Sequence, residues 1–192
     1  MDNNFTDVQS ITEAERLGRL YPIILENHNP GWKEQYEQQK TYLCGIFGDA
    51  VLRISHIGST AVPGLISKPT VDILLEIKEE TDLTQITDIL QNNGYIVNQP
   101  PNDIIMYIKG YGKKGYEDQV FHIHVRKPGD YNESYFRDYL KAHPEVAKEY
   151  GELKKSLKEK FEHDHDGYTA AKGNFIMKIT AAARDEFGDK YK

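Results

Sequence analysis

The chain has 192 residues, which is enough for one domain with a full core, or for such a domain with an appendage. Its formal net charge of −6 argues against a nucleic-acid partner, because phosphate backbones are held by an excess of lysine and arginine. No apolar run reaches the length of a membrane span, and the single cysteine, Cys44, excludes an internal disulfide. We therefore expect a cytoplasmic protein without a membrane partner; its oligomeric state does not follow from the sequence.

The first half of the chain predicts two helices and two strands. Residues 10–13, Ser-Ile-Thr-Glu, are typical of a capping box that opens a short helix ending near Leu20. The Asn-Pro-Gly-Trp segment at 29–32 starts a longer helix that runs to about Phe47. Two apolar strands are then expected at about 51–57 and 70–77, on either side of a Gly-Ser-Thr turn.

The second half predicts three further strands and four helices. A polar helix over 82–93 leads into a strand at 95–97. Strands at 104–109 and 119–126 are joined by a link too short for a crossover helix, so they are expected to be antiparallel. Three helices follow at 132–142, 144–161 and roughly 168–187. We therefore predict an α/β or α+β fold: a mixed sheet of about five strands flanked by helices, with a C-terminal helical segment.

The turn between the first two strands has the features of a phosphate site. Gly58 has no Cβ, so the backbone can turn sharply and approach a ligand. Ser59 and Thr60 add hydroxyl donors, and Lys68 lies in the loop that follows. Asp72 on the next strand supplies a carboxylate that can hold Mg²⁺ against phosphate oxygens.

Alternation along two strands separates apolar from polar side chains. In the strand at 70–77, Asp72 and Glu76 lie on the face opposite an unbroken apolar row. In the strand at 119–126, His122, His124 and Arg126 likewise share one face. If the two strands are neighbours, these five side chains converge beside the Gly-Ser-Thr turn. The alternative is that they form the wet face of an antiparallel sheet.

Two segments near the C-terminus carry weaker signals. Tyr168 and Lys172 lie one helical turn apart beside an apolar stripe, so the lysine either reaches into a pocket or extends to water. Residues 162–166, Glu-His-Asp-His-Asp, superficially suggest a metal cluster. Adjacent residues in a loop seldom make a preorganised site, which favours a solvated loop.

The combination of motifs resembles the GrpB family. It comprises His-Ile-Gly-Ser-Thr-Ala-Val-Pro-Gly-Leu at 56–65 with Lys68-Pro69 and Asp72, and later blocks at 122–125, 136–145 and 168–172. The likeness spans about 22–178, which implies an accessory helix at 1–21 and a single domain at 22–192. The family in turn is similar to the nucleotidyltransferase superfold, whose hallmarks are a Gly-Ser turn and an Asp-x-Asp strand.

The resemblance assigns the turn but leaves the carboxylate set incomplete. Gly58 and Ser59 match the turn of the nucleotidyltransferase superfold, and Asp72 matches its first carboxylate. Leu74 occupies the position of the second aspartate, and the later strand offers histidines where a third carboxylate is usual. Two-metal transfer needs carboxylates that bridge the ions. Glu76 could act as a longer ligand, the histidines could bind a different metal, or the protein could bind nucleotides without transferring them.

Three functions follow from the motifs and the resemblance together. The first is transfer of a nucleotidyl group from a nucleoside triphosphate to an unknown small acceptor, with Mg²⁺ or Mn²⁺. The second is a non-catalytic module that binds a nucleotide or phosphate, and the third is metal-dependent hydrolysis. The catalytic residues would be Asp72, His122, His124 and Arg126; the nucleotide or phosphate ligands His56, Gly58, Ser59, Thr60, Lys68, Tyr168 and Lys172; and the metal ligands Asp72, Glu76, His122 and His124.

Overall fold

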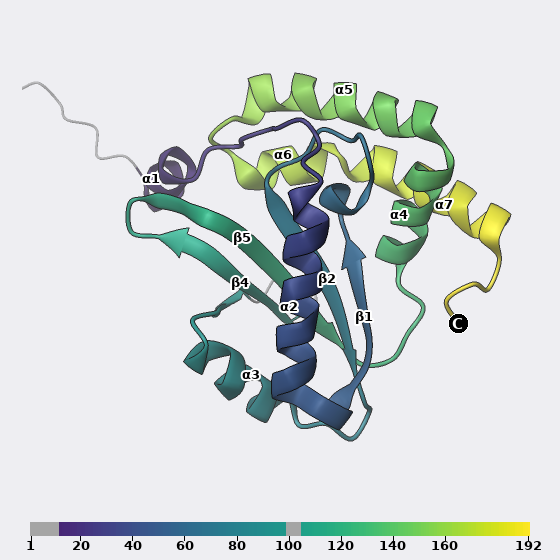
Figure 1. The fold of residues 1–192 in the computed structure, drawn as a ribbon. Helices are drawn as coiled ribbons and strands as arrows, with labels where there is room; N and C mark the ends of the chain where they lie inside the picture. Colours follow the sequence, from purple (N-terminus) through teal and green to yellow (C-terminus); the bar gives the residue numbers. More distant parts are fainter. Residues whose placement is uncertain (1–11, 99–104) are drawn as a thin grey trace, which may run out of the picture.

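A computed structural model describes residues 12–98 and 105–192 (Figure 1). Its strands lie in the middle of the chain between N-terminal and C-terminal helices, with one helix between the second and third strands, which is an α+β arrangement, and their bounds agree with most of those expected. The strands are β1 (Val51–Ile57), β2 (Thr70–Ile77), β3 (Ile96–Asn98), β4 (Ile105–Gly112) and β5 (Gly115–Arg126). The α-helices are α1 (Glu13–Leu20), α2 (Gly31–Phe47), α3 (Leu83–Asn92), α4 (Asn132–Ala142), α5 (Pro144–Phe161), α6 (His165–Ala171) and α7 (Gly173–Phe187); the short 3-10 turns are η1 (Gly48–Ala50) and η2 (Ser59–Ala61).

The described strands form one mixed sheet in the order β1-β2-β5-β4-β3. β2 pairs antiparallel with β1 and parallel with β5, and β4 pairs antiparallel with both β5 and β3. The β4–β5 hairpin is tighter than expected, because the strands continue to a pair between Gly112 and Gly115. The mixed five-stranded sheet is therefore confirmed, and β2 and β5 are neighbours, which is the condition that the sequence left open. That adjacency places Asp72 beside His122 in the register.

The apolar row of β2 faces the main core of the protein. Val71, Ile73, Leu75 and Ile77 are completely buried against side chains of α2 and α3. Figure 1 shows α2 crossing this face of the sheet. The opposite face is not simply wet, since Leu74 is also fully buried and Glu76 is only 2% exposed. The polar face of β2 is thus covered along part of its length.

The C-terminal helices form a second core at the end of the sheet where β1 finishes and β2 begins (Figure 1). One helix was expected over 168–187, but two are present. Lys172 ends α6 and begins α7, and its N–H bonds to the carbonyl of Thr169 three residues back, which tightens the last turn. Within the described residues, none of the helices combines the length and hydropathy that a bilayer span requires.

The capping box of α1 lies two residues later than expected. Ser10 is outside the described residues, and the box joins Thr12 and Glu15: the N–H of Glu15 donates to Thr12 Oγ1 at 3.2 Å, and the N–H of Thr12 donates to Glu15 Oε2 at 2.7 Å. Both segments carry the Ser/Thr-x-x-Glu pattern, which explains the shift. Tyr21, at the end of α1, donates to the carbonyl of Gly112 at the hairpin. The division of the chain at residue 22 stays a prediction.

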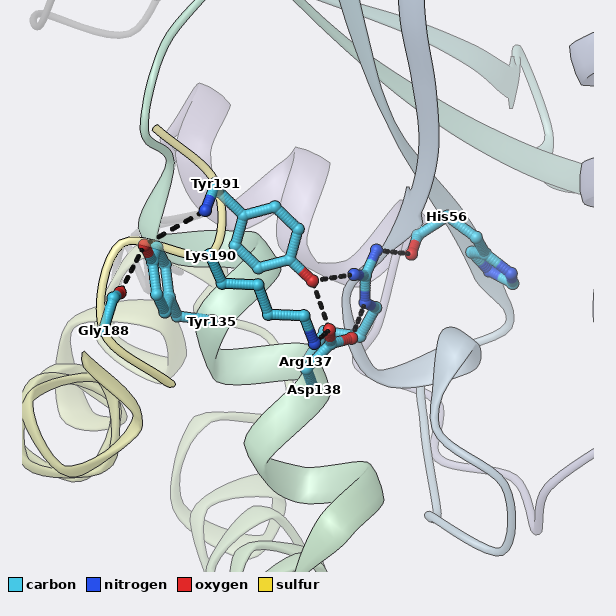
Figure 2. A network of polar contacts seen from close by, with 7 residues as sticks. All are labelled: His56, Tyr135, Arg137, Asp138, Gly188, Lys190 and Tyr191. Atoms are coloured by element: carbon cyan, nitrogen blue, oxygen red, sulfur yellow. Dashed lines mark hydrogen bonds and ion pairs between the residues drawn. The ribbon is translucent and has the colours of Figure 1, made fainter. Parts of the chain in front are cut away.

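A polar network fixes the C-terminal tail to α4 and β1 (Figure 2). Asp138 accepts hydrogen bonds from Arg137 at 2.7 Å, from Lys190 at 2.7 Å and from the Tyr191 hydroxyl. Arg137 also donates to the backbone carbonyl of His56 at 3.0 Å. The tail is therefore connected through one arginine to the strand that precedes the Gly-Ser-Thr turn.

We expect Asp138→Asn to lower the free energy of unfolding by roughly 2 kcal/mol at pH 7, because charged hydrogen bonds of Asp138 are lost. Burial alone would raise the pKa of Asp138, but its bonds with Arg137, Lys190 and Tyr191 lower it well below the ordinary value. The stabilisation is thus present above about pH 4, the unfolded pKa, and declines as the pH falls below it. Urea unfolding at pH 7 and pH 3 should show a difference between wild type and variant that shrinks at pH 3.

The exposed Asp185 of α7 provides the control. Asp185→Asn should change the unfolding free energy little at either pH. An Asp138→Asn effect no larger than that of Asp185→Asn at pH 7 would contradict the importance of the network.

Candidate functional site

A cavity of about 620 Å³ lies between the strand ends and the C-terminal helices. Its walls come from the Gly-Ser-Thr turn, from β2 and β5, from the segment that joins β5 to α4, and from α4 to α7. The lining residues are Gly58, Ser59, Thr60, Lys68, Thr70, Asp72, His122, Arg126, Asp130, Tyr131, Asn132, Glu133, Phe136, Tyr150, Lys154, Tyr168, Lys172, Ile176, Thr180 and Arg184. The cavity therefore contains the turn and most of the residues that the sequence analysis singled out.

Gly58 is required at the turn for two physical reasons. Its φ of 70° lies in the region that residues with a side chain rarely adopt. In addition, a Cβ at this position would meet the carboxylate oxygen Oδ2 of Asp72 at 2.3 Å. The carboxylate of Asp72 thus packs directly on the backbone of Gly58, and this contact joins the turn to β2.

Both histidines of β5 lie close to the carboxylate of Asp72. Its Oδ1 lies 3.3 Å from Nδ1 of His122 and 3.9 Å from Nε2 of His124. Burial alone would raise the pKa of Asp72, but these interactions outweigh burial and lower its pKa far below the ordinary value. The other ring nitrogen of His122 bonds to the Tyr111 hydroxyl at 2.8 Å, so the ring is held at both ends. Asp72 is therefore an ionised carboxylate in the cavity wall, with a side chain that is 25% exposed.

His56 and Thr60 support the turn from behind. The Thr60 hydroxyl donates to the carbonyl of Thr70 at 2.9 Å, so His56 Nε2, at 3.0 Å, must donate its proton to the Thr60 oxygen. The ring of His56 stacks on Tyr36 at 4.7 Å between centroids. Burial lowers the pKa of His56 to about 4, which keeps it neutral at pH 7. His56 does not line the cavity, and its contacts are those of a residue that positions the turn.

Three lysines reach the cavity from separate segments. Lys68 comes from the loop before β2, Lys154 from α5, and Lys172 from the junction of α6 and α7. Lys154 is 3% exposed and donates to the carbonyl of Ile66, while Nζ of Lys172 lies 4.3 Å from the ring centre of Tyr168. Among the salt bridges of the described residues, none involves these three lysines. They are cations beside one cavity without a carboxylate partner of their own.

Burial and mutual repulsion make the protonated lysines costly. Burial, followed by repulsion from Lys68, lowers the pKa of Lys172 to about 8, and burial with repulsion from Lys172 and Lys68 lowers that of Lys154 to about 7. Burial also lowers the pKa of Lys68. Asp72 offsets part of each shift. An anion bound among the lysines would favour their protonated forms.

The two arginines of the cavity differ from the lysines because each has an acidic partner. Arg126 donates to Glu133 at 2.5 Å and Arg184 to Asp130 at 2.6 Å. Arg126 also lies over the ring of Tyr131, at 4.6 Å from its centre. The charges of this part of the cavity are therefore balanced, and the net positive charge is concentrated near Lys68, Lys154 and Lys172.

The geometry does not support Glu76 as a metal ligand. Both of its carboxylate oxygens accept hydrogen bonds from Arg53, the second at 2.7 Å, and Glu76 does not line the cavity. Leu74 is completely buried outside the cavity, so an aspartate there would face no metal and would be an unpaired buried charge. The route through a longer second carboxylate therefore has no structural basis.

The remaining proposed metal ligands, Asp72, His122 and His124, lie close together, but they do not form a metal site. His122 and His124 each point a ring nitrogen at Asp72, and His124 does not line the cavity. Over residues 12–98 and 105–192, no group of three or more histidine, cysteine, aspartate or glutamate side chains is arranged to hold a metal ion. This includes 162–166, where Asp164 instead accepts from the N–H of Gly167 to cap α6. The donor set does not fit a two-metal centre.

Sequence reasoning missed several lining residues. Lys154 carried a usable signal, because it interrupts an apolar helical stripe with Ala147, Tyr150 and Leu157, all of them buried. This is the pattern that drew attention to Lys172. Asp130, Thr180 and Arg184 carried no such signal, since their approach to the cavity depends on how α7 packs beside α4.

Comparison with known proteins identifies the family. A family model described as GrpB protein matches residues 22–182. The chain belongs to the GrpB family. The relatives include UPF0157 protein YqkA of Bacillus subtilis, 33% identical over 165 residues, and the glutamate-rich protein GrpB of Alkalihalophilus pseudofirmus, 33% identical over 170 residues. The matches cover 82% of this chain in both cases, and 47% and 93% of the two relatives, so the chain spans about half the length of the first.

A solved GrpB structure has the same fold. The crystal structure of conserved protein GrpB from Enterococcus faecalis matches with a TM-score of 0.73 at 29% identity, over 85% of this chain and 99% of that one. A weaker likeness, with a TM-score of 0.45 at 12% identity, is to the Cid1 poly(U) polymerase, over 74% of this chain and 47% of that one. A likeness at that level is too low to assign a reaction. The family expected from the motifs is confirmed.

The contact between Gly58 and Asp72 can be tested in this GrpB-family protein with a matched pair of glycines. Gly58→Ala and Gly64→Ala both place a side chain at positive φ, 70° and 76°, but only the first meets Asp72. We expect Gly64→Ala to lower the unfolding free energy by about 1 kcal/mol through backbone strain, and Gly58→Ala to lower it clearly more. Thermal and urea unfolding measure both effects.

The imidazole NMR signals of His122 and His124 are sensitive to the position of the Asp72 carboxylate, because both rings lie beside it. They should shift in Gly58→Ala and stay unchanged in Gly64→Ala. Equal stability losses with unshifted histidine signals in both variants would show that the carboxylate does not depend on Gly58.

Proposed function

We propose that this GrpB-family protein binds a phosphate-bearing ligand, such as ATP, through its phosphate groups in the cavity beside the Gly-Ser-Thr turn. The observation that carries the proposal is the convergence of Lys68, Lys154 and Lys172 on one cavity, each without an acidic partner among the described residues. Buried cations are usually paired, because an unpaired charge in a poorly solvated place destabilises the fold. A polyphosphate supplies the missing negative charge.

The turn adds a second reason for a phosphate ligand. Gly58 and Ser59 present backbone and hydroxyl groups without a bulky side chain at the same end of the cavity as the lysines. The hydroxyl of Tyr168, 1% exposed, lines the same end and has no protein partner in the described chain. Phosphate oxygens can accept from all of these donors at once.

Binding accounts for the cavity better than transfer does. Nucleotidyl transfer by the usual two-metal route needs two or more bridging carboxylates, and Asp72 is the cavity carboxylate that remains without an arginine partner. One observation still favours transfer as a second candidate: Asp72 is kept ionised and partly exposed in the wall. Asp72 could then help to hold a divalent cation brought in with the ligand's phosphates. Metal-dependent hydrolysis lacks a comparable observation, because the described residues contain no group of three or more histidine, cysteine, aspartate or glutamate side chains arranged to hold a metal ion.

Lys172→Met should weaken ATP binding at least tenfold at pH 7, measured by calorimetry, because a cation near the phosphates is lost. The same change should raise the melting temperature of the free protein, since it removes a charge that burial and Lys68 disfavour. Lys178→Met is the matched control, being an exposed lysine on the same helix that lies outside the cavity lining. Equal ATP affinities for the two variants would contradict the proposal.

The pH dependence follows from the lowered lysine pKa values. Free Lys172 and Lys154 lose their protons near pH 8 and 7, and bound phosphate raises both pKa values. ATP binding should therefore take up protons at pH 8, and its affinity should fall as the pH rises from 7 to 9.5. Calorimetry in two buffers with different ionisation enthalpies measures the uptake, which Lys172→Met should reduce. Binding without proton uptake in wild type would be inconsistent with phosphates among these lysines.

Asp72→Asn separates the two candidate functions. In EDTA the variant should bind ATP several-fold more tightly than wild type, because a negative charge is removed from the neighbourhood of the phosphates. If Asp72 serves only the turn, this gain should persist in Mg²⁺. If the variant instead binds ATP more tightly than wild type in EDTA but more weakly in Mg²⁺, this result would support a cation at Asp72 and favour the transfer hypothesis.

A further inference from the structure

The cavity is elongated, and its two ends differ chemically. Lys172, Ile176, Thr180 and Arg184 follow one another at four-residue spacing along one face of α7, and all four line it. At 1.5 Å per residue, this stripe extends about 18 Å. Opposite it, the lining continues along β5 from His122 to the end of the strand. The cationic end holds Gly58, Asp72 and the lysines, and we call the other end, around Arg126, Asp130 and Thr180, the neutral end.

The neutral end contains polar atoms without partners. Six buried side-chain atoms of the described chain lack a hydrogen-bond partner, and four of them belong to residues that line this one cavity. One is the Tyr168 hydroxyl at the cationic end. The other three are Arg126 Nε, Asp130 Oδ1 and Thr180 Oγ1. Thr180 is 6% exposed, so its hydroxyl has little access to bulk water.

The charged groups of the neutral end are already oriented and neutralised. Arg126 uses another nitrogen to donate to Glu133, and Asp130 uses its second oxygen to accept from Arg184. The unpartnered atoms are therefore one donor, Arg126 Nε, one acceptor, Asp130 Oδ1, and the Thr180 hydroxyl, which can act as either. Such a set matches a neutral group with an N–H next to an acceptor, whereas a phosphate there would face the carboxylates of Asp130 and Glu133.

We infer that the neutral end binds the base of a nucleoside 5′-polyphosphate whose phosphates occupy the cationic end. Every nucleobase presents a ring N–H or an amino group beside a carbonyl oxygen or a ring nitrogen, which is the pattern that these three atoms complement. Tyr131 and Phe136 add aromatic surface to the same walls. The inference rests on the proposed function, which by itself requires only phosphates; it adds that the ligand is a nucleotide rather than an inorganic polyphosphate or a phosphorylated sugar.

Thr180→Val is the most direct test, because it replaces a buried hydroxyl by a methyl group of the same shape. Thr180→Ser is the matched control, since it keeps the hydroxyl. Calorimetry would compare ATP, GTP, CTP and UTP with inorganic tripolyphosphate. We expect wild type to bind at least one nucleotide tenfold or more tighter than tripolyphosphate. Thr180→Val should lose about fivefold or more of that affinity while binding tripolyphosphate unchanged, and Thr180→Ser should retain most of it.

Unfolding curves establish that the Thr180 variants are folded, and Asp130→Asn provides a second test at the neutral end. Asp130→Asn should change the order of preference among the four nucleotides, because the acceptor Oδ1 becomes part of an amide. Equal binding of tripolyphosphate and all four nucleotides by wild type would overturn the base site and leave the phosphate site standing. An equal loss for both ligand classes in Thr180→Val would do the same. Failure of wild type to bind either class would overturn the proposed function itself.

Discussion

The close contact between Asp72 and Gly58 is the constraint on which the site depends. It holds the turn against β2, and it brings an ionised carboxylate to the point where β5 delivers two histidines. A larger residue at position 58 would displace the carboxylate, and a longer acid at position 72 would displace the turn. The hydrogen bonds from the His56 ring to the Thr60 hydroxyl, and from that hydroxyl to the backbone carbonyl of Thr70, fix the other side of the same turn. These contacts fix the position of the turn from both sides.

Three lysines, Lys68, Lys154 and Lys172, lie beside this turn, and their positive charges lower the stability of the folded protein. Lys154 is the clearest case, since its pKa of about 7 means that folding disfavours its proton at neutral pH. When such a lysine is protonated, its buried charge destabilises the folded state. When it is neutral, its side chain contributes to packing without that penalty. Residues arranged in this way are typical of sites that gain their stability when a ligand binds.

The sequence predicted the features that depend on short-range order. Period-two alternation separated Asp72 and His122 from the core residues of their strands. The sequence left open whether the two strands are neighbours, and the parallel pairing of β2 with β5 is what brings the two side chains together. The same alternation could not show that Glu76 would meet Arg53, because that contact depends on the register of β1 against β2. The positions of Asp130 and Thr180 in the cavity wall could not be predicted for a related reason. They depend on how α7 packs beside α4, and the packing of two helices produces no periodic pattern in the sequence between them.

The parallel pairing of β2 with β5 also determines when the cavity can form during folding. The β4–β5 hairpin is local and can form early, whereas Asp72 must wait for a partner strand about 50 residues further along the chain. Lys172 and Thr180 belong to the last helices and complete the wall later still. On the ribosome, where the N-terminal part folds first, the sheet can be assembled before the cavity exists. A ligand that occupies this cavity would therefore act late in folding, by stabilising the final docking of α7.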